Sequence, residues 1–381
     1  MIINCKKYKF FCSKITRVKY PFIEIEDFSG KIQIYNKTKV KLGDIITSFC
    51  KIKKTKKKVY YYFPFFIKVI VKCIFNVKKQ FFFKKKIFSI KNLIFNFLNF
   101  FMFLNVNTDN LCPKKFNSIS NNFKTFNFYK KKFFYLKISP ELSIKKILSC
   151  NYNNIYELSN CFRNEGVSNI HNFEFLMLEY YSSNFSFRNS ISFLELFIKN
   201  IFLIHSIFFF NIYKIIFSIK QFFKKKSIIE LLCLVAKKKN IKFLKNTNLL
   251  FYFLIKKNIK ILKSFFLSSL IFKLFDNIII KNYNLPIFVK SYTTKNSLLS
   301  KPNFLNFKFA KRFELYISSI EISNGFNELN DYFLQKINFN KKNKDFLSYI
   351  KKGLQNFNGV GIGINRLLML MYKIKNIKYI K

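Results

Sequence analysis

The sequence has no tryptophan and uses several other residue types sparingly over its 381 residues. It contains eight glycines, six prolines, two histidines and only two alanines, Ala236 and Ala310. This composition excludes a collagen-like chain and a coiled coil, and the chain is too long for a small secreted disulfide scaffold. The 55 phenylalanines and 21 tyrosines exclude disorder of the whole chain, because disordered chains are poor in aromatic residues. The length allows two domains of ordinary size.

Acidic residues are also scarce: 18 Asp and Glu stand against 69 Lys and Arg, for a formal net charge of +51. Only five of the basic residues are arginine, and the abundant Phe, Lys, Ile, Asn and Tyr all have AT-rich codons. We infer an AT-rich coding sequence in which much of the lysine reflects mutational drift. The charge then has two interpretations of equal weight, a nucleic-acid partner or a solvated basic surface. Residue types that persist against the drift are the most informative.

The eight cysteines are scattered without a C-x-x-C pair, which favours reduced thiols in a cytosol-like compartment and argues against a zinc site. The first twenty residues lack the apolar core and cleavage site of a secretory signal, so we expect none. The stretch 201–219 has the length of a membrane span but contains His205, Asn211 and Lys214, which are costly in lipid. We therefore predict a buried amphipathic helix there, with His205 as a packing residue.

The N-terminal region shows the alternation typical of strands. Residues 22–35, FIEIEDFSGKIQIY, predict two strands joined at Ser29-Gly30, and KLGDIITSFCKI predicts a third. A basic segment, KIKKTKKK, follows at 51–58. Short antiparallel strands with a basic tail suit a five-stranded OB-fold barrel that binds single-stranded RNA, although any small β-module would fit the pattern. Further along, the spacing predicts a helix over 91–106, loops over 107–137 and helical sequence over 190–290.

The first cluster of rare residues is IYELSNCFRNEGVSNIHNFEFLMLEYY, residues 155–181. We predict two strands, 155–165 and 173–181, joined by the loop Asn164–Asn172. Such a hairpin places an arginine, glutamates, an aromatic ring and a tyrosine hydroxyl on one surface. These groups can hold a phosphate, stack on a base and receive an amine, so we predict a ligand platform rather than a surface hairpin with incidental charges.

The second cluster, RFELYISSIEISNGFNELND at 312–331, repeats a glutamate every seven residues, at 314, 321 and 328. In a strand–loop–strand arrangement these carboxylates could converge on Mg²⁺, which prefers carboxylates together with phosphate oxygens and water. The alternative is an amphipathic helix with glutamates facing solvent. The Ser323-Asn324-Gly325 segment, which we take as a turn, argues against that helix.

The third cluster, GVGIGINRLLML at 359–370, alternates glycine with Val or Ile. One face of such a strand is bare backbone, on which a flat ligand can lie, and the other face is apolar. Arg366 follows at the predicted start of a helix, where it would meet a phosphate.

Together these segments resemble the class II aminoacyl-tRNA synthetases, and among them the lysyl-tRNA synthetase family. ISPELSIKKIL with YELSNCFRNEGVSNIHNFEFLMLEYY is similar to the family's approach to motif 2 and motif 2 itself, and GVGIGINRLLML is similar to motif 3. FELYISSIEISNGFNELND resembles the lysine- and metal-binding segment, and FIEIEDFSGKIQIY with LGDII resembles the anticodon-binding OB domain. The resemblance implies an α+β fold: a reduced OB-fold barrel over 1–80, then a class II catalytic domain over 81–381. That domain would be an antiparallel sheet flanked by helices, with a helical insertion at about 200–290.

The resemblance also implies a role for each matching residue. The two arginines that would hold the ATP phosphates, and so act catalytically, are Arg163 and Arg366. The ATP site as a whole would comprise Arg163, Glu165, His171, Asn172, Phe175 and Arg366. The lysine pocket would comprise Glu141, Glu179, Tyr181, Asn324, Phe326 and Glu328. Mg²⁺ would be bound by Glu314 and Glu321, and anticodon bases would be contacted by Phe22 and Gln33.

The reaction implied is ATP-dependent activation of L-lysine to lysyl-adenylate and transfer to tRNA(Lys), by a cytoplasmic homodimer with no membrane association. Catalysis would come from positioning and charge neutralisation. The chain departs from the family at several places, among which Asp109 replaces the motif 1 proline of the dimer interface, Phe173 a proline, Ile170 a basic residue and Asn365 an aspartate. Two alternatives are a paralogue that lysylates a protein, which would lack the OB segment, and a non-catalytic RNA-binding protein, which would not need the arginines and glutamates.

Overall fold

The chain separates into two compact units, Met1–Lys86 and Ile87–Lys381, in a computed structural model. The structure describes all residues except 1–3, 6–7, 28–29, 55–59, 74–79, 115–120, 151, 205–208, 213–214, 219–220, 340–343 and 381. Between 236 and 282 it describes only residues 248, 252, 255, 271 and 275.

The first unit is a closed five-stranded barrel with one short additional strand. Its strands are β1 (Asn4–Cys5), β2 (Tyr8–Lys19), β3 (Phe22–Asp27), β4 (Gly30–Tyr35), β5 (Ile45–Lys54) and β6 (Tyr60–Val71). They pair in the order β1-β2-β3-β4-β6-β5, and β2 also pairs with β5, which closes the barrel. The β4–β6 pair is parallel and the others are antiparallel. This is the OB-like barrel that the alternating pattern predicted.

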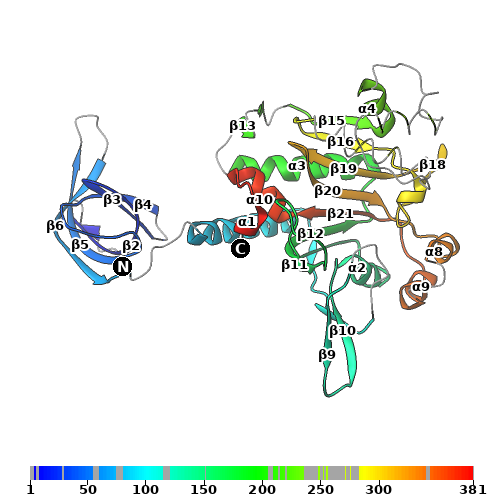
Figure 1. Cartoon of the computed structure of the whole chain (residues 1–381), viewed down its shortest axis with the longest axis horizontal. Helices are drawn as coiled ribbons and strands as arrows, with labels where there is room; N and C mark the ends of the chain where they lie inside the picture. The colour runs from blue at the N-terminus through cyan, green and yellow to red at the C-terminus, as the bar shows by residue number, and fades with distance from the viewer. Residues whose placement is uncertain are drawn as a thin grey trace. The chain divides into compact units, whose positions relative to one another are not determined.

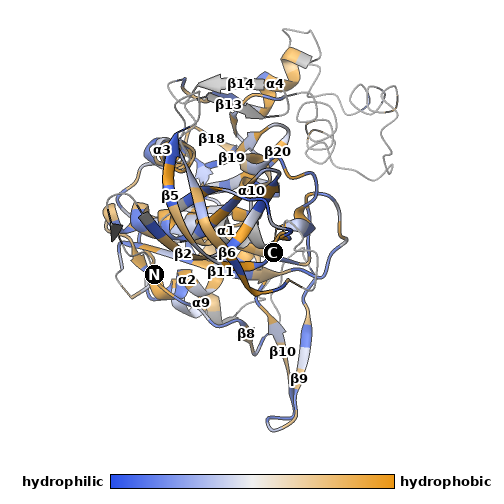
Figure 2. Ribbon diagram, turned by 90° about the vertical axis from the view of Figure 1, so that its left-hand side faces the viewer, coloured by the Kyte–Doolittle hydropathy of each residue, from blue (hydrophilic) through white to orange (hydrophobic). Residues whose placement is uncertain are grey.

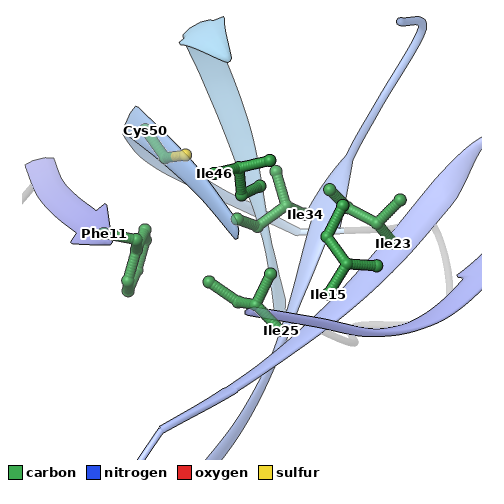
Figure 3. Close-up of a cluster of buried hydrophobic side chains, with 7 residues drawn as sticks. All are labelled: Phe11, Ile15, Ile23, Ile25, Ile34, Ile46 and Cys50. Carbon is green, nitrogen blue, oxygen red and sulfur yellow. The ribbon is translucent and has the colours of Figure 1, made fainter. Parts of the chain in front are cut away.

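Alternation along the strands fills the interior of this barrel. The core consists of Phe11, Ile15, Ile23, Ile25, Ile34, Ile46 and Cys50, which point toward one another (Figure 3). Both strands predicted within 22–35 are confirmed, since Asp27 pairs with Gly30 across β3 and β4. Of the predicted joint, Gly30 begins β4 and Ser29 lies outside the described residues. The strands β2 and β6 were not assigned from sequence. In β6 a Phe- and Tyr-rich run is partly exposed along its whole length, so it shows no clean alternation.

The second unit is built on an eight-stranded sheet (Figure 1). Its strands, in spatial order, are β15 (Lys224–Ser227), β16 (Ile287–Lys290), β19 (Arg312–Ile317), β20 (Ile320–Asn327), β21 (Asn358–Gly363), β12 (Glu174–Ser182), β11 (Asn154–Phe162) and β7 (Leu104–Asn105). The six central strands are antiparallel, while the outermost pairs β15–β16 and β7–β11 are parallel. The predicted antiparallel sheet with flanking helices is therefore confirmed.

The helices are α1 (Gln80–Phe100), α2 (Glu141–Leu148), α3 (Phe187–Ile204), α4 (Ile228–Val235), α8 (Tyr332–Asn338), α9 (Lys344–Lys351) and α10 (Ile364–Tyr372), with 3₁₀ turns η2 (Thr294–Asn296) and η3 (Ile377–Tyr379). Smaller sheets are formed by β8 (Leu111–Cys112), β9 (Lys124–Asn127) and β10 (Lys132–Leu136), by β13 (Phe209–Ile212) and β14 (Ile215–Ser218), and by β17 (Pro302–Asn303) and β18 (Asn306–Ala310). No helix among the described residues is both long and apolar enough to cross a membrane.

Several local predictions were wrong. The stretch 201–219 is not one helix: α3 ends at Ile204 and the β13–β14 hairpin follows, while His205 lies outside the described residues. The predicted loops at 107–137 contain β8, β9 and β10, of which β9 and β10 form a projecting hairpin (Figure 1). The described part of 200–290 includes strands as well as α4. Sequence rich in Phe, Ile and Lys places apolar residues at helical and strand spacings alike, and Figure 2 shows hydrophobic and hydrophilic segments along the same ribbons.

The predicted strand–loop–strand at 312–331 is present, but its turn lies elsewhere. The chain turns at Ser318 and Ser319, whose φ angles are 49° and 64°, between β19 and β20. The segment Ser323-Asn324-Gly325 lies inside β20 and pairs with β21. The predicted helix at 91–106 begins earlier, at Gln80, and ends at Phe100.

Candidate active site

A cavity of about 190 Å³ lies on the central sheet, at the ends of β11, β12 and β21 and beside β20. All six residues of the predicted ATP site line this cavity: Arg163, Glu165, His171, Asn172, Phe175 and Arg366. Glu321 and Asn324, predicted for metal and for lysine, line it too. The sheet brings together three segments that are distant in sequence, because β12 pairs with β21 and β21 pairs with β20.

Arg163 directly follows β11 and faces Phe175 of β12. Its guanidinium carbon lies 5.0 Å from the centre of the Phe175 ring. Its backbone N–H donates to the carbonyl of Phe173 at 2.9 Å, which fixes the end of the hairpin. Its buried Nε has no hydrogen-bond partner among the residues that the structure describes. A buried guanidinium with an unused donor can bind a phosphate or a carboxylate.

The loop between β11 and β12 positions His171 in the cavity. The Ser168 hydroxyl lies 2.8 Å from Nδ1 of His171 and accepts the backbone N–H groups of Ile170 and His171. Burial, with the positive charges of Arg366 and Arg163, lowers the pKa of His171 below its ordinary value. His171 is therefore neutral near pH 7 and can donate or accept one hydrogen bond.

Arg366 lies in the first turn of α10, directly after the glycine strand. Its Nη1 donates to the backbone carbonyl of Glu321 at 3.0 Å and lies 3.3 Å from Oε2 of the same residue. Its Nε donates to the carbonyl of Ile170 at 3.3 Å. The guanidinium thus connects β20 with the loop between β11 and β12 at the rim of the cavity, where an anionic ligand could bind it.

Asn365 is buried beside this site and joins neighbouring segments by hydrogen bonds. The family has aspartate at this position. Oδ1 of Asn365 accepts the backbone N–H of Leu176 at 2.8 Å, and its Nδ2 donates to the carbonyl of Ile380 at 3.3 Å. An ionised aspartate could make only the first of these bonds.

The two predicted metal ligands differ in their surroundings. Glu321 is 38% exposed and lines the cavity. Glu314 is buried, and its carboxylate accepts hydrogen bonds from the hydroxyls of Tyr292 and Tyr316, each at 2.5 Å, and from Arg312 at 2.7 Å. Arg312 also donates to Asn324 at 3.1 Å and stacks over Tyr292. Among the described residues there is no cluster of three or more acidic, His or Cys side chains that could hold a metal ion.

The predicted lysine residues, apart from Asn324, do not line the cavity; Glu179, Tyr181 and Glu328 are buried, and Glu141 and Phe326 are partly exposed. The Tyr181 hydroxyl donates to Oε2 of Glu179 at 2.9 Å. Glu141 and Glu328 both contact the ammonium of Lys145, which also lies 5.3 Å from the centre of the Phe326 ring. Lys145 was not predicted as part of the site: in a lysine-rich chain its residue type carries no signal.

The sheet register explains how this group is assembled. Tyr181 pairs with Gly359 and Glu179 with Gly361 across β12 and β21. A Cβ added at Gly359 would lie 2.4 Å from Cε1 of Tyr181 and 2.3 Å from Oε1 of Glu328. At Gly359 the bare face of the glycine strand, predicted to receive a flat ligand, receives side chains of neighbouring elements, while Gly361 and Gly363 line the cavity.

In the barrel unit, Phe22 and Gln33 lie on the outer surface of adjacent strands. Their neighbours Ile23 and Ile34 point into the core, so the two residues face outward on β3 and β4. Sequence analysis missed the aromatic rings that surround Phe22 on this surface. These rings are Tyr35, Tyr61 and Phe63, with Lys53 3.9 Å from the centre of the Phe63 ring.

Comparison with known proteins agrees with this arrangement. The family described as "tRNA synthetases class II (D, K and N)" matches residues 71–381. A lysine–tRNA ligase of Buchnera aphidicola subsp. Schizaphis graminum is 31% identical over 93% of this chain and 80% of its own length. One from Mycoplasma genitalium is 28% identical over 96% and 85%. Another, from Buchnera aphidicola subsp. Cinara cedri, is 34% identical over 77% of this chain, and the match spans 62% of that relative. This chain therefore belongs to the class II tRNA synthetases of the D, K and N family.

Proposed function

We propose that the chain is a lysine–tRNA ligase, which activates L-lysine with ATP and transfers it to tRNA(Lys). The observation that carries the proposal is a group of three carboxylates next to a cavity with two arginines: Glu179 and Glu328 are buried, and Glu141 is 20% exposed. Buried carboxylates select a cationic side chain, whereas an aspartate or asparagine substrate would need cationic or amide partners there. The names of the relatives support the same substrate.

Activation follows from positioning and charge. Arg163 would hold the α-phosphate and the lysine carboxylate, while Arg366 would hold the γ-phosphate. The adenine ring would lie against Phe175, with Glu165, His171 and Asn172 around the nucleotide. The lysine carboxylate attacks the α-phosphorus in line and pyrophosphate leaves. The terminal ribose hydroxyl of the tRNA then attacks the adenylate carbonyl, and AMP leaves.

We propose Mg²⁺ as the cofactor, with Glu314 and Glu321 as the protein residues that would hold it. Of these, Glu321 fits a direct ligand, because its partly exposed carboxylate faces the cavity. Glu314 already accepts three hydrogen bonds, so it fits a position behind Glu321, outside direct contact with the ion. With so few carboxylates, phosphate oxygens and water would supply the remaining ligands. Bound there, the ion would neutralise phosphate charge.

The other proposed partners are a second copy of the chain and the anticodon. The end of α1 and the edge strand β7 expose Phe100, Met102 and Leu104, and Leu111 is exposed nearby in sequence. Such apolar exposure at a sheet edge suits a homodimer interface. Phe22 and Gln33, within the aromatic and lysine-rich surface of the barrel, would contact anticodon bases by stacking and hydrogen bonding. Since tRNA charging serves the ribosome, we propose the cytoplasm as its compartment.

Lysine-dependent ATP–pyrophosphate exchange tests the activation step. We expect exchange with lysine and none with aspartate or asparagine. Arg163→Ala should lower it by about 10²–10³-fold, because it removes a preorganised donor to developing charge. The control is Arg188→Ala, an exposed arginine of α3 outside the cavity, which should leave exchange unchanged. Exchange that survives Arg163→Ala would contradict the assigned phosphate site.

Charging of tRNA with a UUU anticodon tests the second step. Exchange without charging would favour a protein as the lysine acceptor, and the absence of lysine-dependent exchange would favour a non-catalytic RNA-binding protein.

A further inference from the structure

Lys145 is a buried cation in the middle of the proposed lysine pocket. Its ammonium lies 2.6 Å from Oε1 of Glu141, one helical turn before it on α2, and 2.5 Å from Oε2 of Glu328, which follows β20. The side chain of Lys145 is 3% exposed and that of Glu328 is 1% exposed. Burial alone would lower the pKa of Lys145, but the two carboxylates raise it above its ordinary value. The ammonium is therefore charged and held from two elements.

Displacing this ammonium would leave the buried carboxylate of Glu328 and the 20% exposed carboxylate of Glu141 without a counterion. Breaking one side of a buried ion pair is strongly unfavourable, because the remaining charge loses its partner without regaining water. A substrate ammonium that took the place of Lys145 would gain only the contacts that Lys145 gave up. The contacts with Glu141 and Glu328 thus argue for a cation that stays in place when lysine binds.

The pocket nevertheless retains acceptors that Lys145 does not use. Neither carboxylate oxygen of Glu328 has a hydrogen-bond partner among the described residues, and only Oε2 forms the ion pair with Lys145. Oε1 of Glu328 lies against Gly359 together with the ring of Tyr181, whose hydroxyl donates to Glu179. Glu141 and Glu328 therefore share one internal ammonium, while Oε1 of Glu328 and the carboxylate of Glu179 keep capacity for another.

We propose that Lys145 is a specificity-determining residue, a fixed countercharge that occupies Glu141 and one oxygen of Glu328. The other oxygen of Glu328 and the carboxylate of Glu179 are then left to seat a single second ammonium. This inference rests on the proposed function, since it assigns that second ammonium to the substrate side chain.

The charges around the position of the second ammonium agree with this division of the carboxylates between Lys145 and the substrate. The groups that face Glu179 are Glu141 and Lys145 of α2, Tyr181 of its own strand, Glu328 beyond β20, and the Cys161 thiol of β11. Burial and the charge of Glu141 raise the pKa of Glu179 to about 8, against the lowering effects of Tyr181 and Lys145. Without a second cation the pocket holds a proton that a substrate ammonium would replace.

Lys145→Met tests the proposal, because it removes the charge and keeps a chain of similar length. The matched control is Lys146→Met, the next residue on the same helix, whose ammonium lies over the Tyr349 ring instead. Both are measured in the full chain by exchange, with separate KM values for lysine and ATP. We expect Lys145→Met to raise the lysine KM by at least about tenfold, since Glu141 and Glu328 would repel one another or share a proton. The ATP KM should change by less than about twofold, and the control should change neither.

Chemical rescue separates a fixed countercharge from a placeholder. In Lys145→Ala, added propylammonium should lower the raised lysine KM, while in the parent chain it should not. If Lys145 merely filled the substrate's seat, Lys145→Met would lower the lysine KM and propylammonium would compete with lysine in Lys145→Ala. Either result would overturn the proposal, as would equal changes in the lysine and ATP KM values, which indicate a general structural role.

Two further arms keep the outcomes distinct. Should Lys145→Met not fold, Lys145→Arg, which keeps the charge, should fold and retain a lysine KM within about fivefold of the parent. Failure of Lys145→Arg to bind lysine would contradict a role set by charge. Exchange by the parent chain is measured first, so that failure of the proposed function, seen as no lysine-dependent exchange at all, is not mistaken for failure of this inference.

Discussion

Gly359→Ala gives the sharpest test of the pocket geometry. The added methyl would lie 2.3 Å from Oε1 of Glu328 and 2.4 Å from Cε1 of Tyr181. Ordinary contacts begin near 3.4 Å, so both groups must move by about 1 Å. Both are buried and belong to different elements, and overpacking of this kind costs about 1–3 kcal/mol. The smaller entropy of the unfolded alanine chain offsets about 0.4–1 kcal/mol. We expect a net loss of about 1–2 kcal/mol in the free energy of unfolding.

The effect on lysine should be larger than the effect on stability. A displacement of about 1 Å in a positioning group can cost about 10²-fold in rate, so the kcat/KM for lysine should fall by roughly that factor. Urea unfolding and lysine-dependent exchange measure the two effects. Gly166→Ala is the control, because no atom lies within 4 Å of its added Cβ; its unfolding free energy should stay within about 0.5 kcal/mol. A Gly359→Ala chain with parental stability and kcat/KM would refute the close approach of Glu328 and Tyr181.

Four other predictions concern buried charge and exposed rings. Burial raises the pKa of Glu179 and of Glu328 to about 8 each, so below that pH lysine must displace protons in order to bind. The affinity for lysine, measured by calorimetry, should therefore rise about tenfold per pH unit for each displaced proton as the pH increases toward 8. The free chain binds these protons more tightly folded than unfolded, so it should lose stability between about pH 4.5 and 8, and Glu179→Gln should reduce that loss in urea titrations. Lys137→Met should cost about 3–5 kcal/mol of unfolding free energy, because Lys137 is the buried partner of Glu157 at 2.6 Å. Phe22→Ala should weaken tRNA binding by about 1–3 kcal/mol without changing exchange, and an unchanged dissociation constant would contradict stacking on that surface.

The residues found from sequence were those whose types are scarce in this chain. Arg163, His171 and Arg366 stood out because arginine and histidine persist against a lysine-rich background, and the structure brings all three to one cavity. Gly359 stood out similarly, but its neighbours could not be inferred, because they depend on the register between β21 and β12. Lys145 could not be picked out from sequence because lysine is abundant in this chain. What marks it in the structure is its burial between two carboxylates.

Fold predictions succeeded where one face of a strand is buried and the other is wet. Residues 22–35 alternate cleanly because Ile23, Ile25 and Ile34 fill the barrel core. The fold prediction failed at 201–219, because Phe and Ile occupy helical and strand spacings equally there. Local sequence therefore does not decide between a helix and a strand. The placement of the turn at Ser318 and Ser319 was also missed, since neither residue is a glycine and both adopt positive φ angles.

Closure of the N-terminal barrel bears on how this chain limits aggregation through open strand edges. A coding bias toward Phe, Ile and Tyr enriches it in residues that favour strands, and open strand edges of that composition recruit other chains into intermolecular sheets. Pairing of β2 with β5 leaves the barrel without a long free edge, and the outer strand β7 of the central sheet is only two residues long. The lysines that the same bias supplies keep like-charged molecules apart. A drift that raises the aggregation hazard of the sequence is thus contained by topology and by its own charge.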